Sequence, residues 1–339
     1  MLFIGVSGSG KTVMLNATEE LARMRGWLTL SDNASPTGLL GRLAVAAEAL
    51  LEDFEPPDPS RRVTGVSAAG FGVTVERMSD DVVALGLRAV LTKLGARLAA
   101  SGTGLVITID ELQSGNIDEL REFGAVLEHV TRREQNPIAF AGASLPSIDD
   151  TLLSDDDIAT FLQRCSRYDI DRIDDASATD AIAEPIFDRG GSIADADLER
   201  AVAATSGYAF MIQLVGFHTW KAASDPSAGI TSDETSTSIA EAERRIGRLV
   251  FAPTWRGLSD VDRRFLLAMA RDDDHSRLSN IADRLGVDTN YAGVYRHRLI
   301  RSGMITPTGK GLIDFAHHAT RAWIRNEAAH AAISFPDDE

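Results

Sequence analysis

The residues with the clearest chemical meaning lie at the start of the chain. Residues 5–12 read GVSGSGKT, which matches the pattern G-x-x-x-x-G-K-[ST] of a loop that binds phosphate groups. An apolar strand is expected before it and a helix after it. In such loops backbone N–H groups face a phosphate, the lysine neutralises the β- and γ-phosphates, and the threonine hydroxyl reaches Mg²⁺. We therefore expect ATP and Mg²⁺ as cofactors, held by Gly5, Gly8, Ser9, Gly10, Lys11 and Thr12. The alternative is a Gly/Ser loop that precedes a lysine by chance.

A second group of chemical residues follows an apolar segment. Residues 105–113 read LVITIDELQ, a buried strand that ends in two carboxylates. Asp110 would hold Mg²⁺ directly or through water, together with Thr12. Glu111 would polarise the attacking water as a general base. The alternative for an acidic pair at this place is a solvated turn or a helix N-cap.

Three segments together resemble a known family. GVSGSGKT, then IDELQ, then AFAGASLPS (139–147) are similar to the AAA+ ATPases, especially the origin-recognition-type branch, with the STAND signalling ATPases as a neighbouring match. The resemblance implies an α/β fold whose P-loop NTPase parallel sheet has the strand order 5-1-4-3-2. It also implies a helical lid and a C-terminal winged-helix domain.

The resemblance assigns further roles by position. Ser144, at the end of the fourth strand, corresponds to the polar sensor of the γ-phosphate. Arg164 or Arg167, before the fifth strand, corresponds to an arginine finger that reaches a neighbour's nucleotide. That role implies a homo-oligomer. The alternative for either arginine is an ion pair with acids at 155–157.

The chain departs from the family at two places. The lid segment 205–220 has no arginine at its start, and Gly207-Tyr208-Ala209 resembles the Gly-x-Pro of STAND proteins without its proline. Only four residues precede Gly5, whereas relatives carry an extra segment that helps to hold adenine. We therefore expect either a truncated or misassigned start, or looser adenine binding.

Composition excludes several other classes of protein. The chain has 339 residues, one cysteine (Cys165) and a formal charge of −16. A single cysteine forms no internal disulfide, and no segment has the roughly 20 apolar residues of a membrane span. We expect a cytoplasmic protein of two or three domains, with no membrane partner and with any nucleic-acid contact confined to one region.

The pattern of apolar residues predicts alternating strands and helices up to residue 171, and helices alone from residue 174 to about 250. We expect a P-loop ATPase core at 1–173, a helical lid at 174–252 and a winged helix-turn-helix domain at 253–330. Residues 63–76 alternate and contain glycines, which predicts an inserted β-hairpin of unassigned role. The predicted strands are 2–6, 27–31, 104–110, 137–142 and 167–171, and the predicted helices of the core are 11–25, 38–52, 80–100 and 116–134.

Residues 279–305 fit a helix-turn-helix followed by a wing. Ile281, Ala282 and Leu285 would be buried on the first helix, Gly286 would open the turn, and Asp288 or Thr289 would cap the second helix. A Gly-Lys-Gly tip would form the wing. The residues expected to face duplex DNA are Asn290, Arg296, His297, Arg298, Arg301 and Lys310.

Charge is distributed unevenly along the chain. Residues 254–326 contain 12 Lys and Arg against 8 Asp and Glu, a net of +4, so the rest carries −20. That distribution favours DNA contact through one face. We thus expect an ATP-hydrolysing switch coupled to a DNA-binding winged helix. The alternative is a STAND-like regulator with slow turnover whose winged helix docks a protein. His218, His317 and His318 lack companions at ligand spacing, so we expect them on helix surfaces and no metal besides Mg²⁺.

Overall fold

The computed structural model describes residues 1–53, 80–146, 148 and 160–330. The chain divides into two compact units. The first comprises Met1–Gly5 and Gly10–Ile170, and the second comprises Val6–Ser9 and Asp171–Glu339. The predicted hairpin at 63–76 lies outside the described residues. Of the described helices, none combines the length and the apolar character that a membrane span requires.

A five-stranded parallel sheet forms the centre of the first unit. The strands lie in the order β2-β3-β4-β1-β5, which confirms the expected order 5-1-4-3-2. Parallel pairing places the carboxyl ends of all strands at one edge, where ligands of such folds bind. The strands are β1 (Leu2–Ile4), β2 (Leu28–Asn33), β3 (Leu105–Asp110), β4 (Ile138–Ser144) and β5 (Arg167–Asp169).

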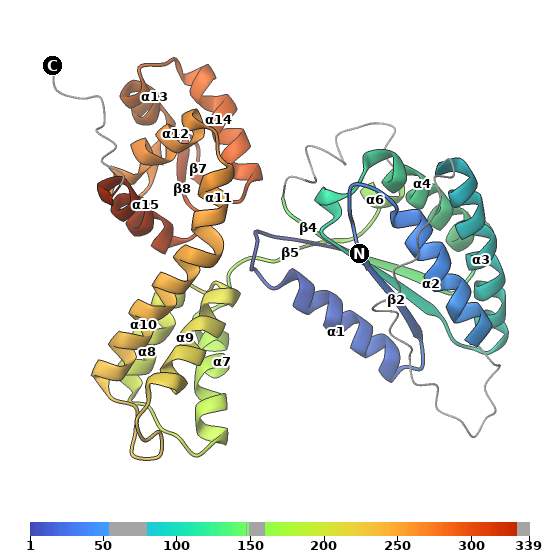
Figure 1. Ribbon diagram of the computed structural model, residues 1–339, viewed down its shortest axis with the longest axis horizontal. Helices are drawn as coiled ribbons and strands as arrows, with labels where there is room; N and C mark the ends of the chain where they lie inside the picture. The colour runs from blue at the N-terminus through green and yellow to red at the C-terminus, as the bar shows by residue number, and fades with distance from the viewer. Residues whose placement is uncertain (54–79, 147, 149–159, 331–339) are drawn as a thin grey trace. The chain divides into compact units, whose positions relative to one another are not determined.

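Helices cover both faces of this sheet (Figure 1). Leu2 and Ile4 of β1 pack with the larger core beneath α2, α3 and α4, while Phe3 between them packs with Leu15 of α1 on the other face. This alternation follows from the two-residue period of a strand. The helices are α1 (Lys11–Met24), α2 (Leu39–Asp53), α3 (Asp80–Ala100) and α4 (Ile117–Glu128), with a short α6 (Thr160–Gln163) before β5. The predicted helix 116–134 is in fact α4 followed by a π-helical turn, η2 (His129–Arg133).

The second unit begins with a group of four helices around a common apolar core. Ile182, Met211, Val215 and Ile246, one or two from each of three helices, are at most 1% exposed. The fourth helix contributes Leu198 to the same core. The four helices are α7 (Asp175–Asp188), α8 (Asp195–Thr205), α9 (Ala209–Ala222) and α10 (Ser232–Ile246).

Helical structure continues through the position where we expected a domain boundary. After α10 come a π-helical turn η3 (Gly247–Phe251) and α11 (Ala252–Gly257), so residues 252 and 253 lie inside a helical segment. The segment ends at Leu258, which has an extended backbone. Trp323 of the last helix packs against both the four-helix core and the core that follows. The second unit therefore has two apolar cores that share a side chain.

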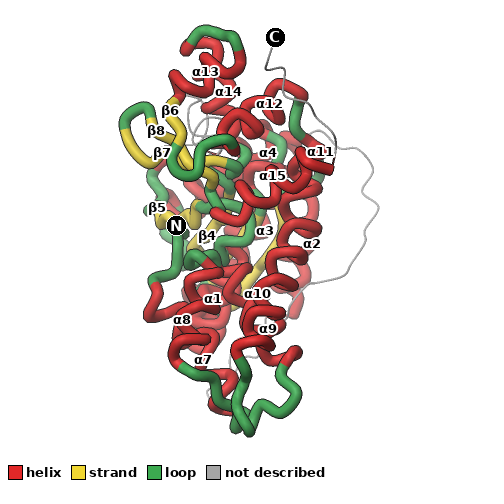
Figure 2. The backbone as a smooth tube through the Cα atoms, turned by 90° about the vertical axis from the view of Figure 1, so that its left-hand side faces the viewer, coloured by secondary structure: helices red, strands yellow, loops and turns green. Residues whose placement is uncertain are grey.

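The C-terminal part of the second unit combines helices with a small antiparallel sheet. The sheet order is β6-β8-β7, and Figure 2 shows these strands side by side next to α13 and α14. Gly286 ends α13 in a left-handed conformation, and Asp288 caps α14 by accepting hydrogen bonds from Asn290 N and Tyr291 N, as helix caps usually do. The elements are α12 (Asp260–Ala270), β6 (Ser276–Arg277), α13 (Leu278–Leu285), α14 (Thr289–Arg301), β7 (Ile305–Gly309), β8 (Leu312–Phe315) and α15 (His318–His330).

Candidate functional site

The phosphate-binding motif forms a tight turn between β1 and α1. Gly8 and Gly10 have φ angles of 78° and 106°, which residues with a Cβ rarely adopt. Gly10 is the N-cap of α1, and Lys11 is the first residue of that helix. Because the first N–H groups of α1 and the positive end of its dipole lie here, the turn is suited to an anion.

Lys11 lies buried at this turn. The residue is only 5% exposed. This burial lowers the pKa of the ammonium group because it disfavours the charged form. The carboxylates of Glu111 and Asp110 oppose that effect and raise the pKa. The two predicted motifs therefore interact electrostatically within the first unit.

Asp110 joins the two motifs by direct contact. Its Oδ2 accepts a hydrogen bond of 2.5 Å from the Thr12 hydroxyl, although the two residues are 98 positions apart. Its Oδ1 accepts the backbone N–H of Glu111 at 2.7 Å. A carboxylate beside a hydroxyl is a donor set that Mg²⁺ accepts, so Thr12 and Asp110 fit the role expected of them.

Glu111 adopts an unusual backbone conformation at the end of β3. Its φ is 54°, in the left-handed region, and its side chain is exposed. Such conformations in residues other than glycine cluster at functional sites. The Glu111 carboxylate accepts a hydrogen bond from the side-chain amide of Gln113. Gln113 in turn accepts a hydrogen bond from the Ser144 hydroxyl at 2.9 Å. Glu111 and Ser144, two of the predicted catalytic residues, are therefore connected through Gln113, which the sequence had not led us to select.

The segment Val6–Ser9 makes its contacts within the second unit. The Tyr208 hydroxyl donates to Ser7 O, and Phe210 N donates to Gly8 O at 3.1 Å. Burial raises the pKa of Tyr208 to about 12, so its hydroxyl stays a donor at neutral pH. Sequence reasoning noted Tyr208 only as part of an incomplete Gly-x-Pro motif. Nothing in the sequence indicates its contact with Ser7, since 201 positions separate the two residues.

Ser9 adds a test of whether the loop suits a phosphate. The residue is 5% exposed, and its hydroxyl has no hydrogen-bond partner among the described side chains and backbone. Buried polar groups normally have one. A phosphate oxygen would satisfy this hydroxyl, so the observation fits a phosphate-binding loop.

The two candidate arginine fingers lie on or near β5. Arg164 is exposed and is 3.5 Å from a carboxylate oxygen of Glu128, which is a long ion pair. Arg167 is the first residue of β5 and is also exposed. The acids at 155–157, which were the alternative partners, lie outside the described residues.

The residues expected to contact DNA have different environments. Asn290, His297 and Lys310 are exposed, whereas Arg296 is half-buried. The Arg298 guanidinium donates to the Asp262 carboxylate, with Nε at 2.9 Å from Oδ1, and to the Ser259 hydroxyl at 2.5 Å. That ion pair raises the pKa of Arg298. Arg301 ends α14, and its side chain is not among those described.

Two of the three histidines that we expected on helix surfaces are buried. His218 and His317 are 7% and 6% exposed, so the expectation of surface positions is wrong for both. His218 lies in α9 between apolar neighbours of the four-helix core, and burial lowers its pKa. The side chain of His318 is not described. A simple count of polar residues misses such positions because histidine packs well against aromatic rings, as His317 does against Tyr208.

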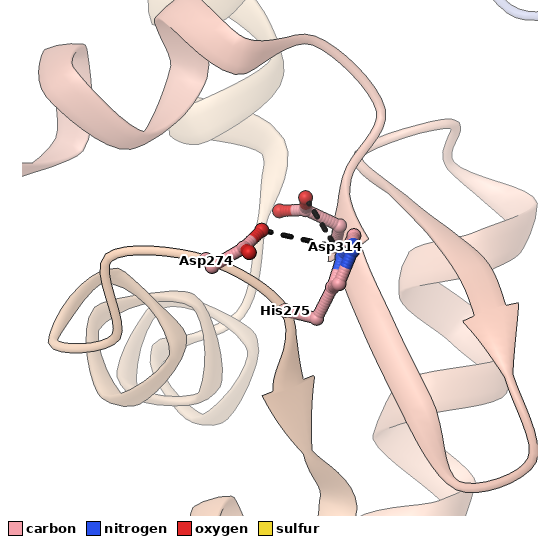
Figure 3. Close-up of side chains that lie close together, drawn as sticks. All are labelled: Asp274, His275 and Asp314. Carbon is pink, nitrogen blue, oxygen red and sulfur yellow. Dashed lines mark ion pairs between the residues drawn. The ribbon is translucent and has the colours of Figure 1, made fainter.

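Another histidine lies between two carboxylates in the C-terminal part (Figure 3). His275 Nδ1 is 3.2 Å from Asp314 Oδ2, and its Nε2 is 3.6 Å from Asp274 Oδ1. The three residues form a group that could hold a metal ion. Arg321 already pairs with Asp314 at 2.6 Å, and Asp274 is largely exposed. We therefore assign these contacts to surface ion pairs.

Comparisons with known proteins agree with this geometry at the level of fold. Residues 248–324 match the model of a domain of unknown function (DUF8462). The chain is similar in structure to the Walker-type ATPase of Pyrococcus abyssi, with a TM-score of 0.69, 13% identity, and coverage of 96% of this chain and 90% of that one. No curated protein matches in sequence.

The ORC2 protein of Aeropyrum pernix is also similar. Its structure with ADPNP and ADP has a TM-score of 0.58 and 12% identity, covering 97% of this chain and 88% of that one. Its ADP form has a TM-score of 0.51 and 14% identity, covering 98% and 88%. The fold of this chain is that of the P-loop ATPases, and its structural neighbours include AAA+ ATPases of the origin-recognition type.

Proposed function

We propose that this chain is a cytoplasmic ATPase switch of the AAA+ type, which binds ATP with Mg²⁺ and hydrolyses it. The observation that carries the proposal is the hydrogen bond between Thr12 and Asp110. It joins a phosphate-binding loop to an acidic strand end across the sheet. If the loop were a chance Gly/Ser segment, or if the acidic pair only capped a helix, no hydrogen bond between Thr12 and Asp110 would be expected.

The residues of the loop would bind the phosphates. The backbone N–H groups of Gly8 and Gly10 and the Ser9 hydroxyl would surround a phosphate, and Lys11 would neutralise the β- and γ-phosphates. Thr12 and Asp110 would hold Mg²⁺. When bound, that ion would offset the charge on the phosphates. Burial of Lys11 would strengthen its interaction with a phosphate because the local dielectric constant is low.

The carboxylate of Glu111 would accept a proton from the attacking water. Its exposure is consistent with this role, since the attacking water must reach it. Ser144 is the last residue of β4, at the same edge of the sheet, and would sense the γ-phosphate. Arg164 or Arg167 of a second copy would stabilise charge in the transition state, which would require a homo-oligomer.

For the C-terminal part we propose a winged helix that binds duplex DNA. The element order α12, β6, α13, α14, β7, β8 supports this proposal, because a helix-turn-helix followed by a β-hairpin wing would have that order. Its surface would be formed by Asn290, His297 and Lys310, with Arg296 and Arg301 beside them. Arg298 would stabilise the unit instead, because Asp262 holds its guanidinium. The proposed parts are a core at 1–173, a lid at 174–252 and this domain at 253–330.

One observation favours a protein partner as the alternative. Val294 and Tyr291, on α14, are 64% and 43% exposed. Exposed apolar side chains on a helix are typical of a protein-docking face, as a STAND-like regulator with slow turnover would have. DNA binding and protein docking differ in how strongly the affinity for the partner falls when salt is added.

The test is steady-state ATP hydrolysis by the purified chain with and without duplex DNA, at low and moderate salt, with Lys11→Ala as the background. We expect turnover that Lys11→Ala abolishes and that DNA changes. Binding of DNA should weaken steeply with salt, because phosphate contacts release counterions. Turnover equal to that of Lys11→Ala would contradict an ATPase, and binding insensitive to salt would favour the protein partner.

A further inference from the structure

The side chain of Gln113 lies between the proposed general base and β4. Gln113 belongs to a short 3-10 helix, η1 (Leu112–Ser114), that follows Glu111. Its Oε1 accepts the Ser144 hydroxyl at 2.9 Å and the backbone N–H of Leu145 at 3.0 Å. Its Nε2 donates to the Glu111 carboxylate. All four residues belong to the first unit.

The chemistry of these groups determines the orientation of the amide. A backbone N–H can only donate, so the amide atom that faces Leu145 N must be the oxygen. The nitrogen must then point the other way, where it can only donate. An ionised carboxylate, which only accepts, is the matching partner. The amide nitrogen of Gln113 therefore faces the Glu111 carboxylate as a donor.

Ser144 and Leu145, which hold the Gln113 amide, lie at the ordered end of β4, whereas the Glu111 side chain is exposed to solvent. Ser144 is fully buried at the end of β4, and Leu145 follows it directly. The Glu111 side chain is exposed, so without a partner it would occupy several rotamers in solvent. A hydrogen bond from an anchored amide restricts it to one.

We propose that Gln113 is a positioning residue that holds the Glu111 carboxylate through its own anchors on Ser144 and Leu145. The inference rests on the proposed function, because it concerns the base of that reaction. It gives Ser144 a second role: its hydroxyl fixes Gln113 and thereby Glu111. A general base must lie within hydrogen-bond reach of the water it activates, so loss of the connection lowers kcat and leaves ATP binding intact.

The first experiment compares Gln113→Leu with Ser114→Ala, an exposed neighbour in the same turn. We expect Gln113→Leu to lower kcat about 10-fold, the size of one hydrogen bond to a charged group, with the Kd for ATP changed less than about 3-fold. Ser114→Ala should change neither. Equal kcat values for the two variants, or a parallel loss of ATP binding, would overturn the proposal.

Gln113→Glu supplies a rescue test. A protonated glutamic acid has one O–H donor and one carbonyl oxygen, the same pattern as the amide. The kcat of Gln113→Glu relative to that of the unaltered chain should therefore rise as the pH falls, whereas that of Gln113→Leu should not. A ratio that falls or stays flat for both variants would contradict the proposed geometry.

Hydrogen–deuterium exchange tests the connection without any turnover. Gln113→Leu and Glu111→Ala should both speed exchange at the Leu145 amide, in peptides that cover the end of β4, because each removes a part of the anchored network. Ser114→Ala should not. Unchanged exchange in Glu111→Ala would overturn the connection. A lack of ATP hydrolysis by the unaltered chain, with the exchange effect present, would instead count against the proposed function alone.

Discussion

The proposed phosphate-binding end of the first unit and the C-terminal part of the second differ in what their charged groups contact. At the sheet edge, Asp110 and Glu111 accept hydrogen bonds from neutral donors, namely a hydroxyl, a backbone N–H and an amide. In the C-terminal part, aspartates meet arginines. Among the described residues, the ion pairs between arginine and aspartate there are Arg263–Asp260, Arg284–Asp272, Arg298–Asp262, Arg321–Asp314 and Arg325–Asp273.

This difference separates charge that is available to a ligand from charge that is used in folding. Neutral donors orient a carboxylate but leave its charge in place, so a cation or a lysine remains attractive to it. An arginine that pairs with a buried aspartate, as Arg298 does with Asp262, has little charge left to offer a phosphate. These pairs already cancel within the net of +4 over residues 254–326, so the charge that this region can present to DNA comes from its other basic residues, whereas the two carboxylates at the sheet edge keep their charge.

The largest expected effect concerns Glu111. Glu111→Gln keeps the size and the hydrogen-bonding reach of the side chain but removes the base, so we expect kcat to fall by about 10²–10⁴-fold while ATP still binds. Single-turnover hydrolysis and equilibrium binding of a fluorescent ATP analogue measure the two effects. If kcat stays within about 3-fold of the original, Glu111 is not the base, and the sheet edge loses its proposed chemistry.

The next effect concerns the hydroxyl that touches Asp110. Thr12→Ala removes a proposed Mg²⁺ ligand, so the Mg²⁺ concentration for half-maximal turnover should rise by about 10-fold or more. Thr18→Ala, in the same helix, provides the control, since the Thr18 hydroxyl donates to Met14 O within that helix. Equal Mg²⁺ dependence in both variants would show that the hydrogen bond between Thr12 and Asp110 serves packing alone.

A pair of variants tests the distinction in the C-terminal part. Arg298→Ala should lower the free energy of unfolding by about 1 kcal/mol, a modest value because the Arg298 side chain is 51% exposed. Lys310→Ala should leave stability unchanged and weaken DNA binding, with a salt slope reduced by about one. Thermal unfolding and DNA titrations at several salt concentrations measure both. The reverse result, in which Arg298→Ala weakens DNA binding and Lys310→Ala does not, would contradict the assignment of Arg298 to folding and of Lys310 to DNA.

The smallest effect concerns Tyr208. Tyr208→Phe removes the hydrogen bond to Ser7 O and keeps the ring, so we expect ATP affinity to fall by about 3–10-fold, the size of one neutral hydrogen bond. Tyr168→Phe, on an exposed residue of β5, is the matched control. ATP titrations that do not distinguish the two variants would mean that Tyr208 has no part in holding the loop for its ligand.

Short sequence motifs predicted where the turn between β1 and α1 lies and where β3 ends in acidic residues. The motif pattern itself specifies Lys11 and Thr12, and the apolar strand before Asp110 specifies which edge that residue reaches. The sheet order followed from the family resemblance, and the structure confirms it. The small three-stranded sheet carries Lys310 between β7 and β8, as the Gly-Lys-Gly tip had indicated.

What the sequence did not reveal depends on partners far apart in the chain. Arg298 meets Asp262 across 36 positions, and Gln113 meets Ser144 across 31. Helical periodicity identifies the face on which Arg298 lies, but it does not identify what packs against that face. The same holds for His218, whose burial follows from the packing of α9 in the four-helix core. Long-range packing decides these cases, and one sequence contains no direct record of it.

The central claim is that the turn between β1 and α1 binds ATP. Isothermal titration of the purified chain with ATP in the presence of Mg²⁺, beside Lys11→Ala, tests it most directly. The account predicts saturable binding near one nucleotide per chain, weakened by about 10²-fold or more in Lys11→Ala, because a buried ammonium group that contacts phosphate is lost. Equal affinities for the two proteins, or no binding by the unaltered chain, would contradict it.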